Sequence, residues 1–104
     1  MTASRLCGVG DLAVGEARRF DAGGVQICLV RCSDGFRAVA DTCSHEDFSL
    51  SEGAVDPDAC EIECWKHGSA FSLLDGEPLT LPATRPVAVY EVLVDGTDVS
   101  VVLP

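Results

Sequence analysis

Cys43-Ser44-His45 and, after an interval of 18 residues, Cys64-Trp65-Lys66-His67 are the two stretches that decide the expected fold of this chain. Each contains one cysteine and one histidine, and the chain has only two histidines in all. Chance would rarely place both histidines within three residues of a cysteine. Two thiolates and two imidazoles on facing loops are ligands that zinc and iron–sulfur clusters use. We therefore predict that the two stretches form one four-ligand metal site.

The order of these residues resembles the Rieske pattern, in which two cysteines hold one iron of a [2Fe–2S] cluster and two histidines hold the other. More narrowly, nearly the whole chain resembles the small soluble ferredoxin components of bacterial ring-hydroxylating dioxygenase systems. The resemblance implies one Rieske-type [2Fe–2S] cluster per chain. Its expected ligands are Cys43, His45, Cys64 and His67.

Two plainer interpretations of the same residues stay open. Cysteine is often just a small buried hydrophobic residue, so the motifs could be a core cysteine pair with two surface histidines, although this does not account for both pairs together. A structural Cys2His2 zinc site would use the same four ligands. Such a protein would be colourless and redox-inactive, and it would serve as a protein-binding module.

The length of the chain limits its function. Its 104 residues suffice for one domain but not for a second catalytic unit. An oxygenase iron site would need two histidines and a carboxylate of its own, and both histidines are already assigned to the cluster. Gly8-Val9-Gly10 is only a fragment of a dinucleotide-binding fingerprint. We therefore expect an electron carrier that has no catalytic residues and no substrate site.

Acidic residues outnumber basic residues by 17 to seven, which gives a net charge of −10. Such a chain would repel nucleic acid and anionic lipid, so we expect no binding to either. A basic protein partner, docking transiently and in a salt-sensitive way, fits better, although ordinary solubility as a monomer is the simpler explanation. Glu46 and Asp47, beside His45, are the expected docking residues. Every charged residue between the two ligand pairs is acidic: Glu46, Asp47, Glu52, Asp56, Asp58, Glu61 and Glu63.

The N-terminal residues lack the basic start and apolar core of a signal peptide. No apolar run approaches membrane-spanning length, so we expect a cytoplasmic protein. Disulfides are rare in that reducing compartment, and the cysteines outside the ligand pairs are therefore interpreted as core-filling thiols. These are Cys7, Cys28, Cys32 and Cys60.

Alternating apolar and polar residues with closely spaced turn signals predict an all-β chain of short strands rather than helices. Asp-Gly pairs supply the positive φ that tight hairpins need. Within one strand, Cys28 and Cys32 should share one face, and Ile27 and Leu29 the other. The predicted strands cover 5–9, 16–20, 25–31, 36–40, 53–55, 60–63, 70–73, 87–94 and 99–103.

By resemblance we expect the Rieske fold, an antiparallel β-sandwich or three-sheet base with a smaller cluster-binding subdomain inserted into it. The base would contain strands from both chain ends, and the subdomain would span about residues 42–75. The whole chain, 1–104, would then be a single Rieske [2Fe–2S] domain. Local patterns predict the strands, whereas their arrangement in sheets is implied only by the resemblance.

The resemblance also implies which residues surround the cluster. Gly68 would turn the backbone so that amides point at the sulfides, and Pro82 would belong to a third loop that covers the cluster. A plain turn is the simpler role for Pro82. Phe48 and Trp65 would shield the cluster from water or simply pack beside it.

Two departures from the Rieske proteins of respiratory complexes concern the reduction potential. Those proteins have a disulfide between the ligand loops, at places that correspond here to Phe48 and Lys66. They also have a serine and a tyrosine that donate hydrogen bonds to cluster sulfur. Ser69 is retained, but the tyrosine position is Phe71. Losing one donor leaves the reduced cluster less stabilised, so we predict a low Rieske potential of about −150 mV.

The resemblance implies a one-electron carrier between a flavin-dependent reductase and the terminal non-haem iron oxygenase of a ring-hydroxylating system. An alternative with similar chemistry is the small Rieske-like subunit of assimilatory nitrite reductase. Some members of that family lack the four ligands, whereas all four are present here. The ferredoxin interpretation is therefore preferred, with the structural zinc module as a more distant alternative.

Overall fold

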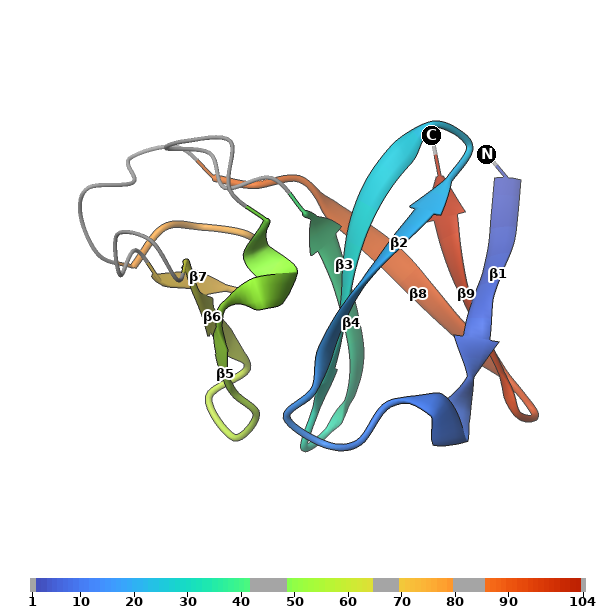
Figure 1. Cartoon of the computed structure of the whole chain (residues 1–104), viewed down its shortest axis with the longest axis horizontal. Coiled ribbons are helices and arrows are strands. Elements are labelled where there is room, and N and C mark those ends of the chain that lie inside the picture. The colour runs from blue at the N-terminus through green and yellow to red at the C-terminus, as the bar shows by residue number, and fades with distance from the viewer. Residues whose placement is uncertain (1, 42–48, 65–69, 80–85, 104) are drawn as a thin grey trace.

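The structure, a computed structural model, describes residues 2–41, 49–64, 70–79 and 86–103 (Figure 1). All nine predicted strands are present in these residues, and every pairing is antiparallel. The ends of the strands differ from the predicted bounds by at most three residues. The strands are β1 (Thr2–Gly8), β2 (Ala17–Ala22), β3 (Val25–Cys32), β4 (Gly35–Ala40), β5 (Ala54–Asp56), β6 (Glu61–Glu63), β7 (Ala70–Ser72), β8 (Val89–Asp95) and β9 (Asp98–Leu103).

Two single turns of 3-10 helix, η1 (Val9–Asp11) and η2 (Leu50–Glu52), do not follow from the sequence patterns. A three-residue turn has no hydrophobic period, so periodicity cannot reveal it. The first turn is stabilised locally, because the Asp11 carboxylate accepts a hydrogen bond from the Gly8 backbone N–H at 2.8 Å. No helix among the described residues is long and apolar enough to cross a membrane.

Six strands form one sheet in the order β1-β9-β8-β4-β3-β2. The link between its two halves is short, since β4 and β8 pair only through Ala38 with Tyr90 and Val39 with Val89. The sheet folds at this link, and the two halves enclose a core that draws on β1, β3, β4 and β9 (Figure 1). The buried residues of this first core are Cys7, Leu12, Ile27, Leu29, Ala38, Val99, Val101 and Leu103. The predicted β-sandwich is thereby confirmed.

Strand β3 is buried on both faces. Ile27 and Leu29 lie in the first core, whereas Cys28, Val30 and Cys32 lie in a second core on the opposite face, as the predicted alternation requires. Removing a large aliphatic side chain from water contributes about 1.5–3 kcal/mol. Strand β3 therefore contributes one face to the core of the sandwich and the other face to the second core.

The second core lies between β3 and β4 of the large sheet and a three-stranded sheet in the order β5-β6-β7. Val55, Ile62 and Phe71 are directly opposite one another across these three strands and point toward this core. The neighbouring positions on each strand therefore face outward. The remaining buried members of the second core come from both sheets and their connections: Val39, Leu50, Cys60, Cys64, Leu73 and Val87.

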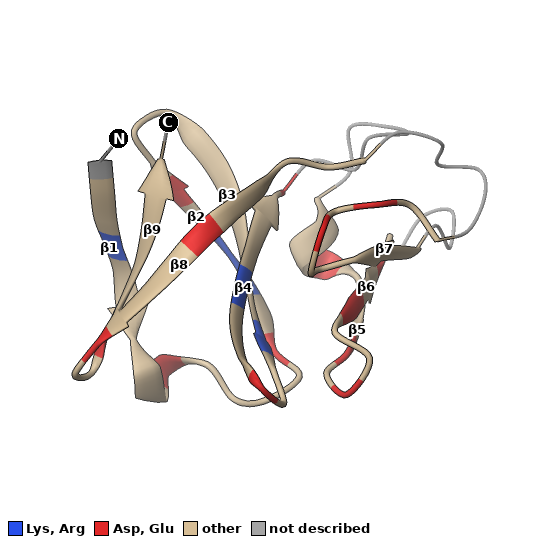
Figure 2. Ribbon diagram, turned by 180° about the vertical axis from the view of Figure 1, so that it is seen from behind, with Lys and Arg blue, Asp and Glu red and all other residues tan. Residues whose placement is uncertain are grey.

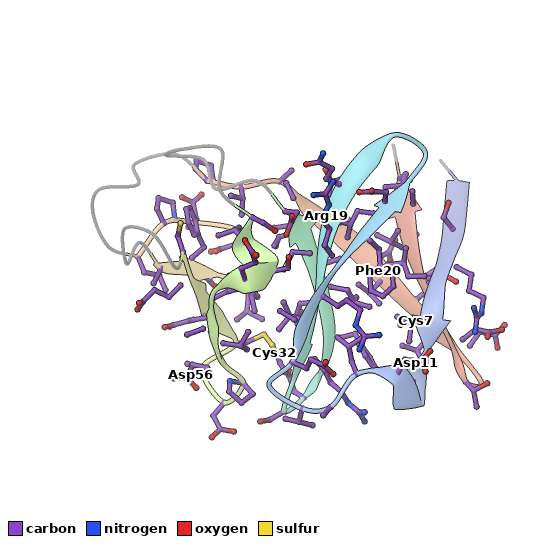
Figure 3. All side chains as sticks on the ribbon, in the orientation of Figure 1. Cys7, Asp11, Arg19, Phe20, Cys32 and Asp56 are labelled. Atoms are coloured by element: carbon purple, nitrogen blue, oxygen red, sulfur yellow. A yellow bond between two sulfur atoms is a disulfide. The ribbon has the colours of Figure 1, made fainter. Side chains whose placement is uncertain are left out.

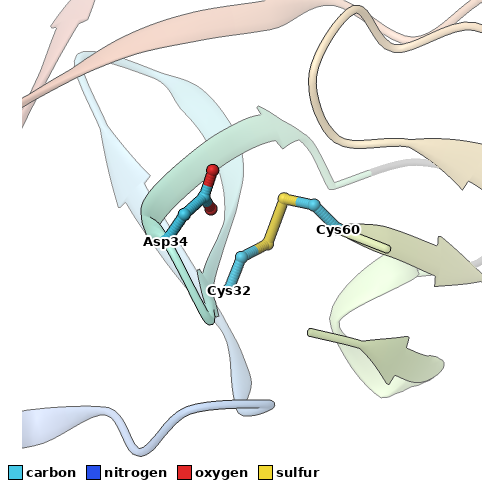
Figure 4. Close-up of side chains that lie close together, drawn as sticks. All are labelled: Cys32, Asp34 and Cys60. Atoms are coloured by element: carbon cyan, nitrogen blue, oxygen red, sulfur yellow. A yellow bond between two sulfur atoms is a disulfide. The ribbon is translucent and has the colours of Figure 1, made fainter. Parts of the chain in front are cut away.

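Cys32 and Cys60 form a disulfide, so their interpretation as core-filling thiols is wrong (Figures 3 and 4). Cys32 ends β3, and Cys60 directly precedes β6, with a Cα–Cα distance of 5.5 Å that suits a disulfide. The two residues are 28 positions apart in the chain. Sequence patterns do not show that the β5–β6 turn lies against the end of β3. Cys7 and Cys28 are buried free cysteines, as predicted.

Candidate metal centre

Cys64 is the one predicted metal ligand that lies within the described residues. It directly follows β6, its side chain is fully buried, and it is not part of a disulfide. It belongs to the same buried cluster as Ile62 and Phe71. A metal deprotonates a thiol that binds it, and Cys64 is a free thiol buried among apolar side chains. The described part of the site therefore fits an iron–sulfur cluster.

Apart from Phe71, the other predicted site residues lie outside the described residues, in segments 42–48, 65–69 and 80–85. Their roles stay predictions. They are the ligands Cys43, His45 and His67, the neighbours Phe48, Trp65, Lys66, Gly68, Ser69 and Pro82, and the docking residues Glu46 and Asp47.

The described residues at the two ends of each ligand segment are held together. At segment 42–48, the Asp41 carbonyl accepts a hydrogen bond from the Leu50 backbone N–H at 2.5 Å. At segment 65–69, Glu63 and Ala70 are paired residues of the β6–β7 ladder. The described residues that flank each ligand segment are therefore paired with one another through the backbone.

The bases of these loops also lie next to one another. The Gly53 N–H donates to the Leu50 carbonyl at 2.9 Å, and a Cβ at Gly53 would collide with the Glu63 carbonyl. On the other side, the Leu79 N–H, which precedes segment 80–85, donates to the Ala70 carbonyl at 2.7 Å. The three segments that carry the predicted ligands and covering loop thus start from one small region beside Cys64.

Phe71 is the only predicted neighbour of the cluster that the structure describes. It lies in β7 opposite Ile62, is fully buried, and forms an isolated bridge with Pro78. Phe71 belongs to the same buried hydrophobic cluster as Cys64. This position is compatible with its predicted role as a neighbour of the iron–sulfur cluster. The ring carries no hydroxyl, so it has no donor to offer to sulfur.

Asp41, directly before segment 42–48, is a buried charged residue that the sequence patterns do not single out. Its side chain is only 2% exposed, although charged residues are almost never fully buried unless they are paired. Its carboxylate accepts hydrogen bonds from the Ser49 hydroxyl at 2.5 Å and from the Ser51 N–H at 3.0 Å. The sequence does contain a possible signal for this contact: Asp41 directly precedes the first ligand segment, and Ser49 and Ser51 follow it closely.

Cys32, Asp34 and Cys60 place their sulfur and carboxylate oxygen atoms within 4.8 Å of one another (Figure 4). The two sulfurs are already bonded to each other, and the Asp34 carboxylate pairs with Arg37 at 3.2 Å. We therefore assign these residues to a structural disulfide and not to a second metal site.

Charge is unevenly distributed over the described residues (Figure 2). The described arginines all belong to the region of the large sheet: Arg5, Arg18, Arg19, Arg31 and Arg37. Within 49–64 and 70–79 every charged residue is acidic. On the outer face of the small sheet, Asp56, Glu61 and Glu63 line a hollow beside Ala54 and Ala70. This face has a negative charge that no described cation neutralises.

The comparisons with known proteins agree with this geometry. The family model described as "Rieske [2Fe-2S] domain" matches residues 2–91. The 3-phenylpropionate/cinnamic acid dioxygenase ferredoxin subunit of Shigella boydii serotype 4 (strain Sb227) is 43% identical over 98 residues, which cover 94% of this chain and 91% of that protein.

Solved structures show the same relationship. The ferredoxin of carbazole 1,9a-dioxygenase from Nocardioides aromaticivorans IC177 superposes with a TM-score of 0.93 at 35% identity, over 97% of both chains. A chain from a complex of reduced oxygenase and oxidized ferredoxin in carbazole 1,9a-dioxygenase gives 0.87 at 39% identity, over 95% of this chain and 100% of that one. A putative nitrite reductase small subunit from Mycobacterium tuberculosis also gives 0.87, over 96% of this chain and 93% of that one, but its identity of 24% shows only the shared fold. The chain therefore belongs to the Rieske [2Fe–2S] domain family.

Proposed function

We propose that this protein is a one-electron carrier of a ring-hydroxylating dioxygenase system. The observation that supports this most strongly is the 43% identity, over 94% of the chain, to a protein named as a dioxygenase ferredoxin subunit. The size of the chain agrees, because 104 residues suffice for a single small domain such as an electron carrier.

We propose that Cys43, His45, Cys64 and His67 bind the cluster. A bound Rieske cluster accepts and releases one electron, at a potential raised by its two neutral histidine ligands. Three features of the described residues support this ligand set: Cys64 is buried, the residues that flank each ligand segment are paired, and the two sets of flanking residues are adjacent. We also propose that the cluster-binding subdomain spans about residues 42–75 of a single domain, 1–104.

We propose that electrons come from a flavin-dependent reductase and pass to a terminal oxygenase. The comparison with a ferredoxin taken from a complex with its oxygenase supports the second partner. The uncompensated acidic residues on the small sheet favour transient, salt-sensitive docking to basic surfaces. We further propose that the protein is monomeric and cytoplasmic.

The nitrite reductase alternative is less favoured, because the similarity to such a subunit extends to the fold alone. The zinc module is disfavoured by membership of an iron–sulfur family.

Reconstitution tests the proposed function. Reductase and oxygenase components of a related dioxygenase should turn over their aromatic substrate when this protein is added and stay idle without it. A Cys64→Ala variant, which lacks one proposed ligand, should support no turnover of the aromatic substrate. Turnover that is equally fast with the variant, or that never depends on this protein, would refute the role as carrier.

A further inference from the structure

We propose that Asp41 is a positioning residue that holds the first ligand loop in place and, through its buried negative charge, lowers the reduction potential of the cluster. The inference rests on the proposed function, since Cys43 and His45 are proposed ligands within segment 42–48. It goes further by assigning a role to a residue that is not itself a ligand.

Hydrogen bonds between Asp41 and residues 49–51 support the positioning role; we call this set of hydrogen bonds the clasp. Asp41 directly precedes segment 42–48, and it accepts hydrogen bonds from the three consecutive residues that follow the segment. Its main-chain carbonyl accepts from Leu50 N–H, one carboxylate oxygen from Ser51 N–H, and the other from the Ser49 hydroxyl. The Asp41 N–H in turn donates to the Gln26 carbonyl at 3.1 Å. One residue thus joins the two described flanks of segment 42–48 to each other and to the first residues of β3.

Burying a carboxylate costs free energy that hydrogen bonds and a nearby cation only partly offset. The side chain of Arg19 is the described cation beside Asp41, with its Nε at 3.9 Å from a carboxylate oxygen. That arginine is shared, because the same Nε lies 3.3 Å from the exposed carboxylate of Asp21. A neutral asparagine could make similar hydrogen bonds without the cost of a buried charge. The retained charge is therefore expected to act on something besides the local fold.

The cluster is the group on which this charge would act. Asp41 is two residues from the proposed ligand Cys43, and a charge buried away from water is screened much less than an exposed one. An anion disfavours the added electron of the reduced cluster, so it lowers the reduction potential. Arg19, which partly neutralises Asp41, acts in the opposite direction.

Three variants distinguish the effect of the Asp41 charge from the effect of its hydrogen bonds on the local structure. Asp41→Asn keeps the shape and can still accept from Ser51 N–H and donate to the Ser49 hydroxyl, but it removes the charge. Arg19→Gln removes the counter-charge from an exposed edge strand, where the fold is not at risk. Asp21→Asn is the matched control, since it removes the same charge from an exposed neighbour of the same arginine.

The test is a redox titration of the holo-protein, followed by EPR spectroscopy of the reduced cluster. We expect a more positive potential for Asp41→Asn, a more negative potential for Arg19→Gln, and a clearly smaller positive shift for Asp21→Asn. Loss of packing alone would not give shifts of opposite sign. Equal shifts for Asp41→Asn and Asp21→Asn, or no negative shift for Arg19→Gln, would overturn the electrostatic role.

The clasp has its own readout. Ser49→Ala keeps the charge but removes one hydrogen bond at the base of the loop, so loss of the visible chromophore to a chelator should be about tenfold faster than in the wild type. An unchanged rate would overturn the positioning role. A wild-type protein without a [2Fe–2S] EPR signal would instead refute the proposed function, so the two failures are distinguishable.

Discussion

The sulfur of Cys32, at the end of β3, is bonded to the sulfur of Cys60, in the turn that precedes β6. This bond is a covalent connection between the large and small sheets, and both cysteines are buried in the core that the sheets share. The small sheet has only three-residue strands, whereas strands are usually about five to six residues long. Its attachment to β3 therefore depends on the second core and on this bond.

We predict that replacing both cysteines by serine lowers the free energy of unfolding by about 3 kcal/mol, because the bond closes a loop of 28 residues in the unfolded chain. Urea denaturation of the holo-protein, with and without a thiol reductant, measures this. The reductant should destabilise the wild type and leave the double variant unaffected. If the wild type is equally stable under both conditions, the disulfide does not contribute.

A second prediction concerns the close approach of η2 and β6. A Cβ at Gly53 would collide with the Glu63 carbonyl, directly before Cys64, so Gly53→Ala should cost about 2 kcal/mol or more and should speed loss of the cluster. Gly10→Ala is the matched control, because a Cβ there meets nothing within 4 Å. Thermal denaturation and chelator-induced bleaching measure the two effects. Equal stability of the two variants would contradict this account of Gly53.

A third prediction concerns the hydrogen-bond donor that a tyrosine hydroxyl would supply at the position of Phe71. Phe71→Tyr should raise the reduction potential by about 40 mV, the shift that a hydrogen bond worth about 1 kcal/mol more in the reduced state would give. Phe71→Leu fills the same buried position without a hydroxyl and should show no such rise. A wild-type potential well above zero, or a Tyr variant that matches the Leu variant, would show that this position does not tune the cluster.

A fourth prediction concerns docking. Neutralising Asp56, Glu61 and Glu63 as Asn or Gln should slow electron transfer from the reductase about tenfold at low salt and should flatten its dependence on ionic strength. Glu91→Gln with Asp95→Asn is the control, since β8 runs away from the small sheet toward the far end of the molecule (Figure 2). If electron transfer slowed equally in the small-sheet variant and in the β8 control, the cause would be the net charge of the protein and not the acidic outer face of the small sheet.

A fifth prediction follows from Cys28. Burial raises the pKa of its thiol, and the Asp41 carboxylate adds to that rise. The folded state therefore keeps this proton at pH values where the unfolded state has lost it, which is above about 8.5. Stability due to the neutral thiol should fall as the pH rises beyond that value. The slope of unfolding free energy against pH, from 8.5 upward, should be shallower in Cys28→Ala, and parallel slopes would be the contrary result.

The sequence predicted the strands well because each leaves a local trace. Alternation along β3 correctly assigned Ile27 and Leu29 to one face and Cys28 and Cys32 to the other. Ser33 and Asp34 form the turn between β3 and β4, and Gly35, the first residue of β4, has a positive φ of 141°. The arrangement of the strands in sheets was implied only by resemblance, since pairings such as β4 with β8 leave no local pattern.

What the sequence did not reveal depends on contacts between distant residues. The Cys32–Cys60 bond needs the β5–β6 turn to lie against the end of β3. Disulfides are also rare in the reducing compartment that the sequence predicts. The burial of Asp41 was hidden for a similar reason, because an aspartate next to a loop is usually solvated. Of the predicted site, Cys64 and Phe71 lie in the same buried cluster, while the remaining residues lie outside the described ranges.

The central claim is that two cysteines and two histidines hold one [2Fe–2S] cluster, and low-temperature EPR spectroscopy of the dithionite-reduced protein tests it most directly. We predict a brown protein whose visible absorption bleaches on reduction and whose reduced signal has an average g value below that of an all-cysteine cluster, because two ligands are neutral imidazoles. A colourless protein with stoichiometric zinc, or a signal typical of four cysteine ligands, would contradict the claim.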